Sequence, residues 1–268
     1  MTAGPIRVGI GGWDYDPWRG TFYPPGLPKA KQLEHASRRV TAIEINATFY
    51  KLQTPELYAR WAAAVPEDFR FALKGSRFCT NRKLLGEAGE AVARFCGQGL
   101  AELGPRLGPI LWQLAETKRF DPDEIRGFFA LLPRAQDGVA LRHAVEVRHE
   151  SFADPEFAAL ARQAGVAVSF ADAPGLPAIE APADGFAYAR LKGMSEPEPL
   201  GYRPAELDRW AELARRWAGP GREVYVFMIN GAKVRAPAAA EGLLARLRPA
   251  PLTSRRRRQL SNRQKDVS

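Results

Sequence analysis

Several short apolar runs in this chain of 268 residues end in charged or amide side chains. In VEVRH, Glu146 and Arg148 share one face of a two-residue period, and Val145 and Val147 share the other. Carboxylates and cations that lie together can transfer protons and stabilise negative charge. Comparable side chains near other run ends are Glu44, Lys74, Gln113, Asp172, Arg190, Lys192 and Asn230. These residue types indicate acid–base chemistry on an anionic substrate, provided that the fold brings the run ends together.

The run AIEINATFY, residues 42 to 50, raises the question of what its polar face contacts. A two-residue period puts Glu44, Asn46, Thr48 and Tyr50 on one face and four apolar side chains on the other. An edge strand that faces solvent would have this pattern, and so would a strand whose second face lines a polar interior. The other runs must decide between the two.

Eight apolar runs have the composition of strands, and most are separated by segments long enough for a helix. The predicted strands are 6–10, 42–50, 69–74, 109–114, 143–149, 166–172, 186–193 and 223–230. The predicted helices are 28–39, 55–64, 82–103, 121–132, 154–164, 204–218 and 237–247, and several begin with a proline. Strands that alternate with helices are typical of a parallel α/β protein.

The polar run ends favour a barrel over a doubly wound open sheet. Helices cover both faces of an open parallel sheet, so both faces of its strands are apolar. A barrel strand packs one face on outer helices and lines the interior with the other, and polar side chains are tolerated there at the C-terminal ends. The length fits an eight-stranded barrel of about 250 residues. We therefore predict a single TIM-like barrel domain over residues 1–248, with a polar mouth.

The charge of the chain is concentrated at its C-terminal end. The net charge is +9, but six of the 39 basic and one of the 30 acidic residues follow residue 248, which leaves 33 against 29, or +4. Residues 249–268 are predicted to be a disordered basic tail, which either contacts nucleic acid or an acidic membrane surface or is simply solvated. The sequence has no membrane-spanning run and no signal peptide, which predicts a cytoplasmic protein.

Cofactor signals are weak. Cys79 and Cys96 are too few for a disulfide framework or a four-cysteine zinc site. GIGGWD lacks the glycine spacing of a dinucleotide-binding turn, so no nicotinamide cofactor is expected. Among three histidines only His149 lies near the predicted mouth. It is a candidate acid–base group, and with carboxylates it could hold a divalent cation such as magnesium, or it could be an ordinary loop residue.

Three loops near the predicted mouth are candidates for ligand contacts. WDYDPWRGTFYPP after the first strand is either a stacking lid or a satellite core; Trp18 and Phe22 are interpreted as structural, and Trp13 and Tyr15 stay open. Residues 193–203, GMSEPEPLGYR, form a second candidate lid. NGAKVRAP follows the last strand, where this fold often binds phosphate, although a plain turn is the alternative. The residues of phosphate-binding type are Lys192, Gly193, Gly231 and Lys233.

The chain resembles the YecE-like proteins, known as domain of unknown function 72. The motifs that carry the resemblance are GIGGWDYDPWRGTFYP, EINATFY, FALKGSRFCTN, LGPILWQL, EVRHESF, YARLKG and GYRPAELDRWA, in this order. The resemblance implies a TIM-like barrel and no established activity. Three positions depart from the family pattern: Asn81 and Lys192 stand where histidine is usual, and Ile229 replaces the first of two asparagines. If either missing histidine is an obligatory acid or base, this protein is impaired or works differently.

The leading hypothesis is an enzyme, a possible hydrolase or lyase, that acts on a small anionic or phosphorylated substrate. In it Glu44 or Glu146 is the base, Asp172 orients, and His149 is a further catalytic candidate. The substrate-binding candidates are Trp13, Asn46, Tyr50, Lys74, Gln113, Arg148, Arg190, Lys192 and Asn230. The alternatives are a structural ion-pair network, a nucleic-acid-binding protein or nuclease by analogy to barrel endonucleases, and a barrel that has lost activity.

Overall fold

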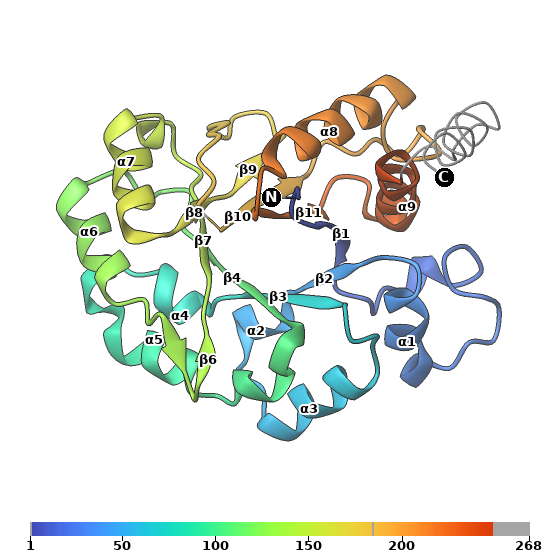
Figure 1. The fold of residues 1–268 in the computed structure, drawn as a ribbon, viewed down its shortest axis with the longest axis horizontal. Coiled ribbons are helices and arrows are strands. Elements are labelled where there is room, and N and C mark those ends of the chain that lie inside the picture. Colours follow the sequence, from blue (N-terminus) through green and yellow to red (C-terminus); the bar gives the residue numbers. More distant parts are fainter. Residues whose placement is uncertain (1, 184, 249–268) are drawn as a thin grey trace, which may run out of the picture.

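The fold is a parallel barrel surrounded by helices, seen here in a computed structural model that describes residues 2–183 and 185–248 (Figure 1). Nine strands form one sheet in the order β8-β7-β4-β3-β2-β1-β11-β10-β9, and every pairing within it is parallel. The prediction of a TIM-like barrel is confirmed. The predicted basic tail, residues 249–268, lies outside the described residues.

The strands of the barrel occur where the apolar runs predict them, although most end earlier. They are β1 (Ile6–Gly11), β2 (Ala42–Ile45), β3 (Arg70–Lys74), β4 (Leu107–Gln113), β7 (His143–Glu146), β8 (Ala167–Val168), β9 (Phe170–Ala171), β10 (Phe186–Leu191) and β11 (Glu223–Met228). A separate hairpin joins β5 (Ala135–Gln136) to β6 (Val139–Ala140). The strands β8 and β9 are two halves of one predicted strand, and they pair with β7 and β10 respectively, so the barrel is nearly closed.

The helices surround the sheet in sequence order (Figure 1). They are α1 (Gln32–Ser37), α2 (Ala47–Tyr50), α3 (Pro55–Ala63), α4 (Arg77–Thr80), α5 (Gly89–Cys96), α6 (Pro122–Ala130), α7 (Pro155–Ala164), α8 (Pro204–Trp217) and α9 (Ala236–Leu247). Short 3-10 helices are Asp16–Trp18, Lys29–Lys31, Leu85–Ala88, Leu100–Arg106, Glu150–Phe152 and Lys233–Arg235. None of the helices in the described part of the chain is long and apolar enough to cross a membrane.

Capping side chains begin several helices at the predicted prolines. Thr54, Asp121 and Asp154 each accept a hydrogen bond from a backbone N–H of the first turn of α3, α6 and α7. The single helix predicted over residues 82–103 is wrong. The backbone turns to a positive φ of 96° at Gly99, and three short helical pieces replace the long one.

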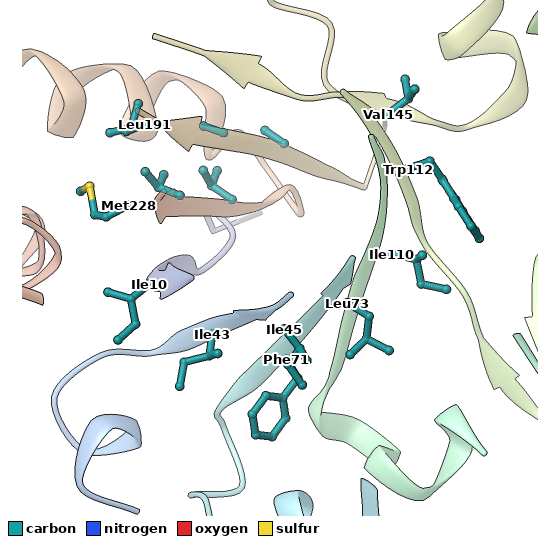
Figure 2. Close-up of a cluster of buried hydrophobic side chains, with 14 of the residues drawn as sticks. Ile10, Ile43, Ile45, Phe71, Leu73, Ile110, Trp112, Val145, Leu191 and Met228 are labelled. Carbon is teal, nitrogen blue, oxygen red and sulfur yellow. The ribbon is translucent and has the colours of Figure 1, made fainter. Parts of the chain in front are cut away.

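The core has two layers because successive side chains of a strand point to opposite faces. Outward-facing side chains such as Ile43, Leu73, Trp112 and Val145 point away from the centre of the barrel toward the helices (Figure 2). A smaller inner cluster fills the interior and comprises Ala42, Ala72, Leu111, Ala144, Ala167, Ala183, Phe186, Tyr188, Tyr225, Phe227 and Ile229. Glu44 lies between outward Ile43 and Ile45 on β2 and is completely buried. The polar face of this strand therefore lines the interior of the barrel.

The alternation predicted for residues 42 to 50 is wrong beyond Ile45, where β2 ends. Asn46 has helical dihedral angles and precedes α2, the single turn Ala47–Tyr50. The Thr48 hydroxyl donates to the backbone oxygens of Ile45 (3.0 Å) and Lys74 (2.7 Å), which fixes this turn at the end of the strand. As a result Tyr50 leaves the interior face, and it is 62% exposed.

Candidate functional site

The centre of the candidate site is Arg190, at the C-terminal end of β10. Its Nη2 and Nε lie 2.9 and 3.0 Å from the two carboxylate oxygens of Glu44, which is a bidentate pair. Its Nη1 donates to Glu146 Oε2 at 2.5 Å and to Gln113 Oε1 at 3.1 Å. These side chains come from β2, β4, β7 and β10, and both glutamates are completely buried. The predicted meeting of run ends inside the barrel is thus observed for these four residues.

Further donors occupy the remaining oxygens of the two glutamates. The Tyr188 hydroxyl donates to Glu44 Oε2 at 2.8 Å. Glu146 Oε1 accepts from Lys192 Nζ at 2.8 Å and from Arg148 Nε at 3.1 Å. Burial alone would raise the pKa of Glu146, but the charges of Arg190 and Lys192 hold that pKa well below its usual range. Glu146 is therefore ionised at neutral pH, and both of its oxygens are engaged.

Lys74 differs from the other cations of the mouth. It ends β3, its residue is only 8% exposed, and its Nζ lies 4.1 Å from the centre of the Phe49 ring. Within residues 2–183 and 185–248, no carboxylate lies within 4.0 Å of this Nζ, and no hydrogen-bond acceptor reaches it. Burial, and after it the nearby charge of Arg190, lower the pKa of the Lys74 ammonium to about 8, although the charges of Glu44 and Glu146 act in the opposite direction. An ammonium that no carboxylate contacts can bind an anion or exchange a proton near neutral pH.

The mouth carries an excess of positive charge. Lys74, Arg190, Lys192 and Arg148 face two buried carboxylates, those of Glu44 and Glu146. The outer end of Arg148 pairs with Glu116 at 2.6 Å, but that glutamate is 74% exposed, so solvent screens its charge. A buried excess of cations favours an anionic ligand.

Asp172 follows β9 and binds the loop that follows β10. Its carboxylate accepts from the backbone N–H of Lys192, from that of Gly193 at 3.1 Å, and from the Tyr202 hydroxyl at 2.5 Å. Burial raises the pKa of Asp172 in spite of these donors. Asp172 is therefore separate from the Arg190 cluster, and it anchors both ends of the candidate lid of residues 193–203.

Three other predicted residues do not join the cluster. The Nδ1 of His149 accepts from the backbone N–H of Ser151 at 3.1 Å and so caps the 3-10 helix Glu150–Phe152. Trp13 packs edge-on against Trp61, with ring centres 5.4 Å apart, outside the sheet. Tyr50 is exposed on α2. The sequence predicted the right region for these residues, because all follow strand ends, but could not predict the direction of their side chains.

Asn46 and Asn230 line a small cavity of about 50 Å³ at the ends of β1 and β11, together with Gly11, Trp18, Met228, Ile229, Lys233 and Ala236. Asn230 has a positive φ of 60°, which asparagine tolerates better than most residues. The cavity is large enough for about one water molecule. These two amides lie at the mouth, apart from the contacts of Arg190.

The aromatic first loop is mainly a satellite core. Trp18, Phe22 and Tyr23 are buried, as the structural interpretation of the first two predicts. Trp18 Nε1 donates to the backbone oxygen of Lys233 at 3.0 Å, and Lys233 Nζ lies 4.4 Å from the centre of the Tyr15 ring. This loop thus joins the first strand to the predicted phosphate loop after the last one.

Sequence reasoning missed two contributors to the cluster. Tyr188 faces inward with Arg190, but nothing in the sequence indicated that its hydroxyl would bind Glu44. Glu116 lies in the loop after β4, where no periodicity predicts a direction. No group of three or more His, Cys, Asp or Glu side chains in the described part of the chain is arranged to hold a metal ion.

Fold and site together define a class of protein. It is a parallel α/β barrel with buried cations and carboxylates at the C-terminal ends of its strands. The chain belongs to the family described as "Protein of unknown function DUF72", whose sequence profile matches residues 7–263. The resemblance to the YecE-like proteins is thereby confirmed. Lys192, at a position where that resemblance predicts histidine, binds Glu146.

Known relatives agree with this assignment. The UPF0759 protein YecE of Escherichia coli (strain K12) is 29% identical over 147 residues, which is 55% of this chain and 50% of YecE. The chain thus spans about half the length of the curated relatives it matches. Two solved structures of DUF72 family proteins are also similar. That from Thermotoga maritima MSB8 has a TM-score of 0.72 and 24% identity, covering 91% of this chain and 99% of that one. That from Enterococcus faecalis V583 has a TM-score of 0.66 and 18% identity, covering 92% and 99% respectively.

Proposed function

We propose that this protein is an enzyme that performs acid–base chemistry on a small anionic or phosphorylated substrate at the C-terminal mouth of the barrel. The observation that carries this proposal is Lys74, a largely buried lysine whose ammonium has no carboxylate within 4.0 Å among the described residues, beside a closely paired ion cluster. The Nζ atom of Lys74 is not among the fully buried polar atoms that lack a partner, so solvent reaches it and an anion can pair with it there. A pKa of about 8 also suits a group that gives or takes a proton near neutral pH.

The remaining cluster residues act as support in this proposal. Both oxygens of Glu44 and of Glu146 already accept hydrogen bonds, and both residues are completely buried, so a substrate reaches them less easily than it reaches Lys74. The amine of Lys74 is therefore better placed than either glutamate to transfer a proton. Glu44 and Glu146 hold Arg190 and Lys192 in position, and these cations stabilise charge that develops on the substrate.

The neighbouring loops offer a place for the phosphate of a substrate. The loops after β10 and β11 lie against each other, because the backbone N–H of Ala232 donates to Met194 O at 3.1 Å. Lys233 lies on the second loop beside the Tyr15 ring, and Gly193 and Gly231 are exposed on the first and second loop respectively, although the Gly193 N–H already donates to Asp172. This is the end of the barrel at which the fold commonly binds phosphate.

A thermal unfolding screen against sulfate, inorganic phosphate and sugar phosphates tests the proposal. A ligand present at about 100 times its Kd stabilises the folded protein by about 2.7 kcal/mol, or roughly 5 to 10 °C in a chain of this size. We expect at least one anion to do so, and the shift to disappear in Lys74→Met. The matched control is Lys31→Met, which removes a lysine that is 63% exposed on the outer surface and should retain the shift.

Two outcomes would contradict the proposal. One is the absence of any stabilising anion at millimolar concentration. The other is a shift that Lys74→Met retains in full, which would place the bound anion elsewhere on the protein.

A further inference from the structure

A second concave surface lies beside the barrel mouth, between α2, α4 and α5. Its cavity of about 430 Å³ is lined by Tyr50, Lys51, Leu52, Ser76, Phe78, Arg82, Glu90, Ala91 and Arg94. Ligand cavities of small molecules are commonly of this size. None of its lining residues contacts the Arg190 cluster, so this is a separate surface.

Two exposed aromatic rings dominate the cavity. Tyr50 is 62% exposed and Phe78 is 61% exposed. Each lies on a single-turn helix that directs its neighbours inward, because Thr48 and Phe49 of α2, and Cys79 of α4, are buried. Large rings that remain exposed while their neighbours pack are typical of a binding surface.

A cation lies beside both rings. The guanidinium carbon of Arg77 is 5.9 Å from the centre of the Tyr50 ring and 5.4 Å from that of Phe78. Both distances lie within the range of a cation–π interaction. A flat aromatic ligand could bind the same ring faces, and Arg77 could stack on it or contact its anionic substituent.

The charge around the cavity selects an anion. Lys51, Arg82 and Arg94 are the cations among the lining residues, and Glu90 is the acid. Glu90 already pairs with Arg94 at 2.8 Å. Counting Arg77, four cations face one carboxylate, so the ligand that fits is both aromatic and negatively charged.

We propose that this cavity binds a nucleobase joined to a phosphate, with the base on Tyr50 and Phe78 and the phosphate near Arg82 and Arg94. Exposed aromatic rings bordered by arginines are how many proteins bind unpaired bases. The ligand is either a free nucleotide or one unit of a single strand. This site is additional to the mouth and does not depend on the chemistry proposed there.

Calorimetric titration of the full chain with adenosine 5′-monophosphate, adenosine and ribose 5-phosphate tests the base and the phosphate separately. We expect the nucleotide to bind more tightly than either half. Tyr50→Ala and Phe78→Ala should each weaken it roughly five- to 150-fold, the range for loss of one stacked base. Leu84→Ala is the matched control, since Leu84 is also exposed, at 51%, but does not line the cavity.

The charge contribution has its own matched pair. Arg94→Gln and Arg126→Gln each remove a surface arginine that pairs with an acid one helical turn earlier, but Arg126 lies on α6. We expect only Arg94→Gln to weaken the nucleotide. Titration with an oligothymidylate of about ten residues distinguishes a single strand from a free nucleotide as the ligand. Tighter binding of the oligonucleotide than of the mononucleotide would indicate a strand, and the reverse a free nucleotide.

Three results would overturn the inference. The first is no binding of nucleotide or oligonucleotide at millimolar concentration. The second is nucleotide binding that survives both aromatic substitutions, or nucleotide binding that is lost in Lys74→Met. The first of these would show that the rings do not hold the base, and the other would place the ligand at the mouth. The third is a change of sedimentation coefficient rather than of nucleotide affinity in Tyr50→Ala, which would show that the rings belong to a protein interface.

Discussion

Replacing Arg190 by methionine should destabilise the fold by leaving buried carboxylates without their main cation. Glu146 would keep Lys192 and Arg148, but Glu44 would keep only the Tyr188 hydroxyl as a hydrogen-bond donor from residues 2–183 and 185–248. Both glutamates are completely buried, so solvent cannot replace the guanidinium. Removing one partner of a buried pair costs about 3 to 5 kcal/mol. That is a large share of the roughly 5 to 15 kcal/mol that stabilises an ordinary domain.

Urea unfolding at several pH values measures the loss and identifies its cause. A loss of about 4 kcal/mol lowers the urea midpoint by roughly 1 to 2 M. In the wild type the pKa of Glu146 is lowered on folding, so its stabilising contribution is complete above the unfolded pKa and disappears only as the pH falls through the folded one. Arg190 is the largest of the charges that hold the pKa of Glu146 down, so Arg190→Met retains less of this contribution. The difference in stability between variant and wild type should therefore shrink as the pH falls from about 7 to about 4.

A second substitution separates electrostatics from packing. Glu44→Gln introduced into Arg190→Met removes the unpaired charge and should restore at least half of the lost stability, although Glu44→Gln alone destabilises. If Arg190→Met loses less than about 1 kcal/mol, or loses the same at both pH values without rescue, the cluster is not the electrostatic unit that its contacts indicate.

Three further predictions concern other parts of the molecule. Sulfate, whose charge is constant near neutral pH, should bind the mouth less tightly as the pH rises through about 8, because the Lys74 ammonium then deprotonates; calorimetry at about pH 7 and 9 measures this. Gly9→Ala should cost at least about 3 kcal/mol by thermal unfolding, since its Cβ would lie 2.1 Å from a β2 carbonyl oxygen, whereas Gly127→Ala has no atom within 4 Å and should be neutral or stabilising. Cys79 and Cys96 are buried, and burial raises the pKa of each thiol to about 12, so a thiol reagent at about pH 8 should modify them only after unfolding.

The central residues of the site could be predicted because strands have a strict two-residue period. Each of four residues shares a face with an interior apolar side chain two positions earlier and lies at the C-terminal end of a strand: Glu44 with Ala42, Lys74 with Ala72, Gln113 with Leu111, and Arg190 with Tyr188. In a closed parallel barrel these ends meet, so face and end together determine position. The sequence does not predict which acids Arg190 pairs with. Arg190 joins two glutamates 146 and 44 positions away in the sequence, and only the closed barrel determines which acids it reaches.

The predictions fail beyond the end of a strand, because the two-residue period predicts side-chain direction only while the backbone is extended. In AIEINATFY the polar alternation continues past Ile45, but the Thr48 hydroxyl donates hydrogen bonds to the backbone oxygens of Ile45 and Lys74, which favours a helical turn there. Tyr50 therefore leaves the mouth and joins Phe78 at the neighbouring cavity. His149 is a similar case, since its ring caps a turn rather than facing Glu146. Local hydrogen bonds determine the directions of these two side chains, and the periodicity of the sequence does not predict such hydrogen bonds.

The opposite end of the barrel shows what a purely structural charge cluster in this protein is like. There Glu223 accepts from Arg7 at 3.0 Å and from Arg142 at 2.7 Å, and one further nitrogen of each arginine donates to Asp68 O and to the Tyr225 hydroxyl respectively. Each cation of that cluster has an acceptor, as a network retained for stability requires. The mouth contains an equally well paired cluster and, beside it, Lys74 with no acceptor in the part of the chain that the structure describes. A structural network accounts for the first and does not include the second, so the proposed anion site rests on this one amine rather than on the whole set of charges.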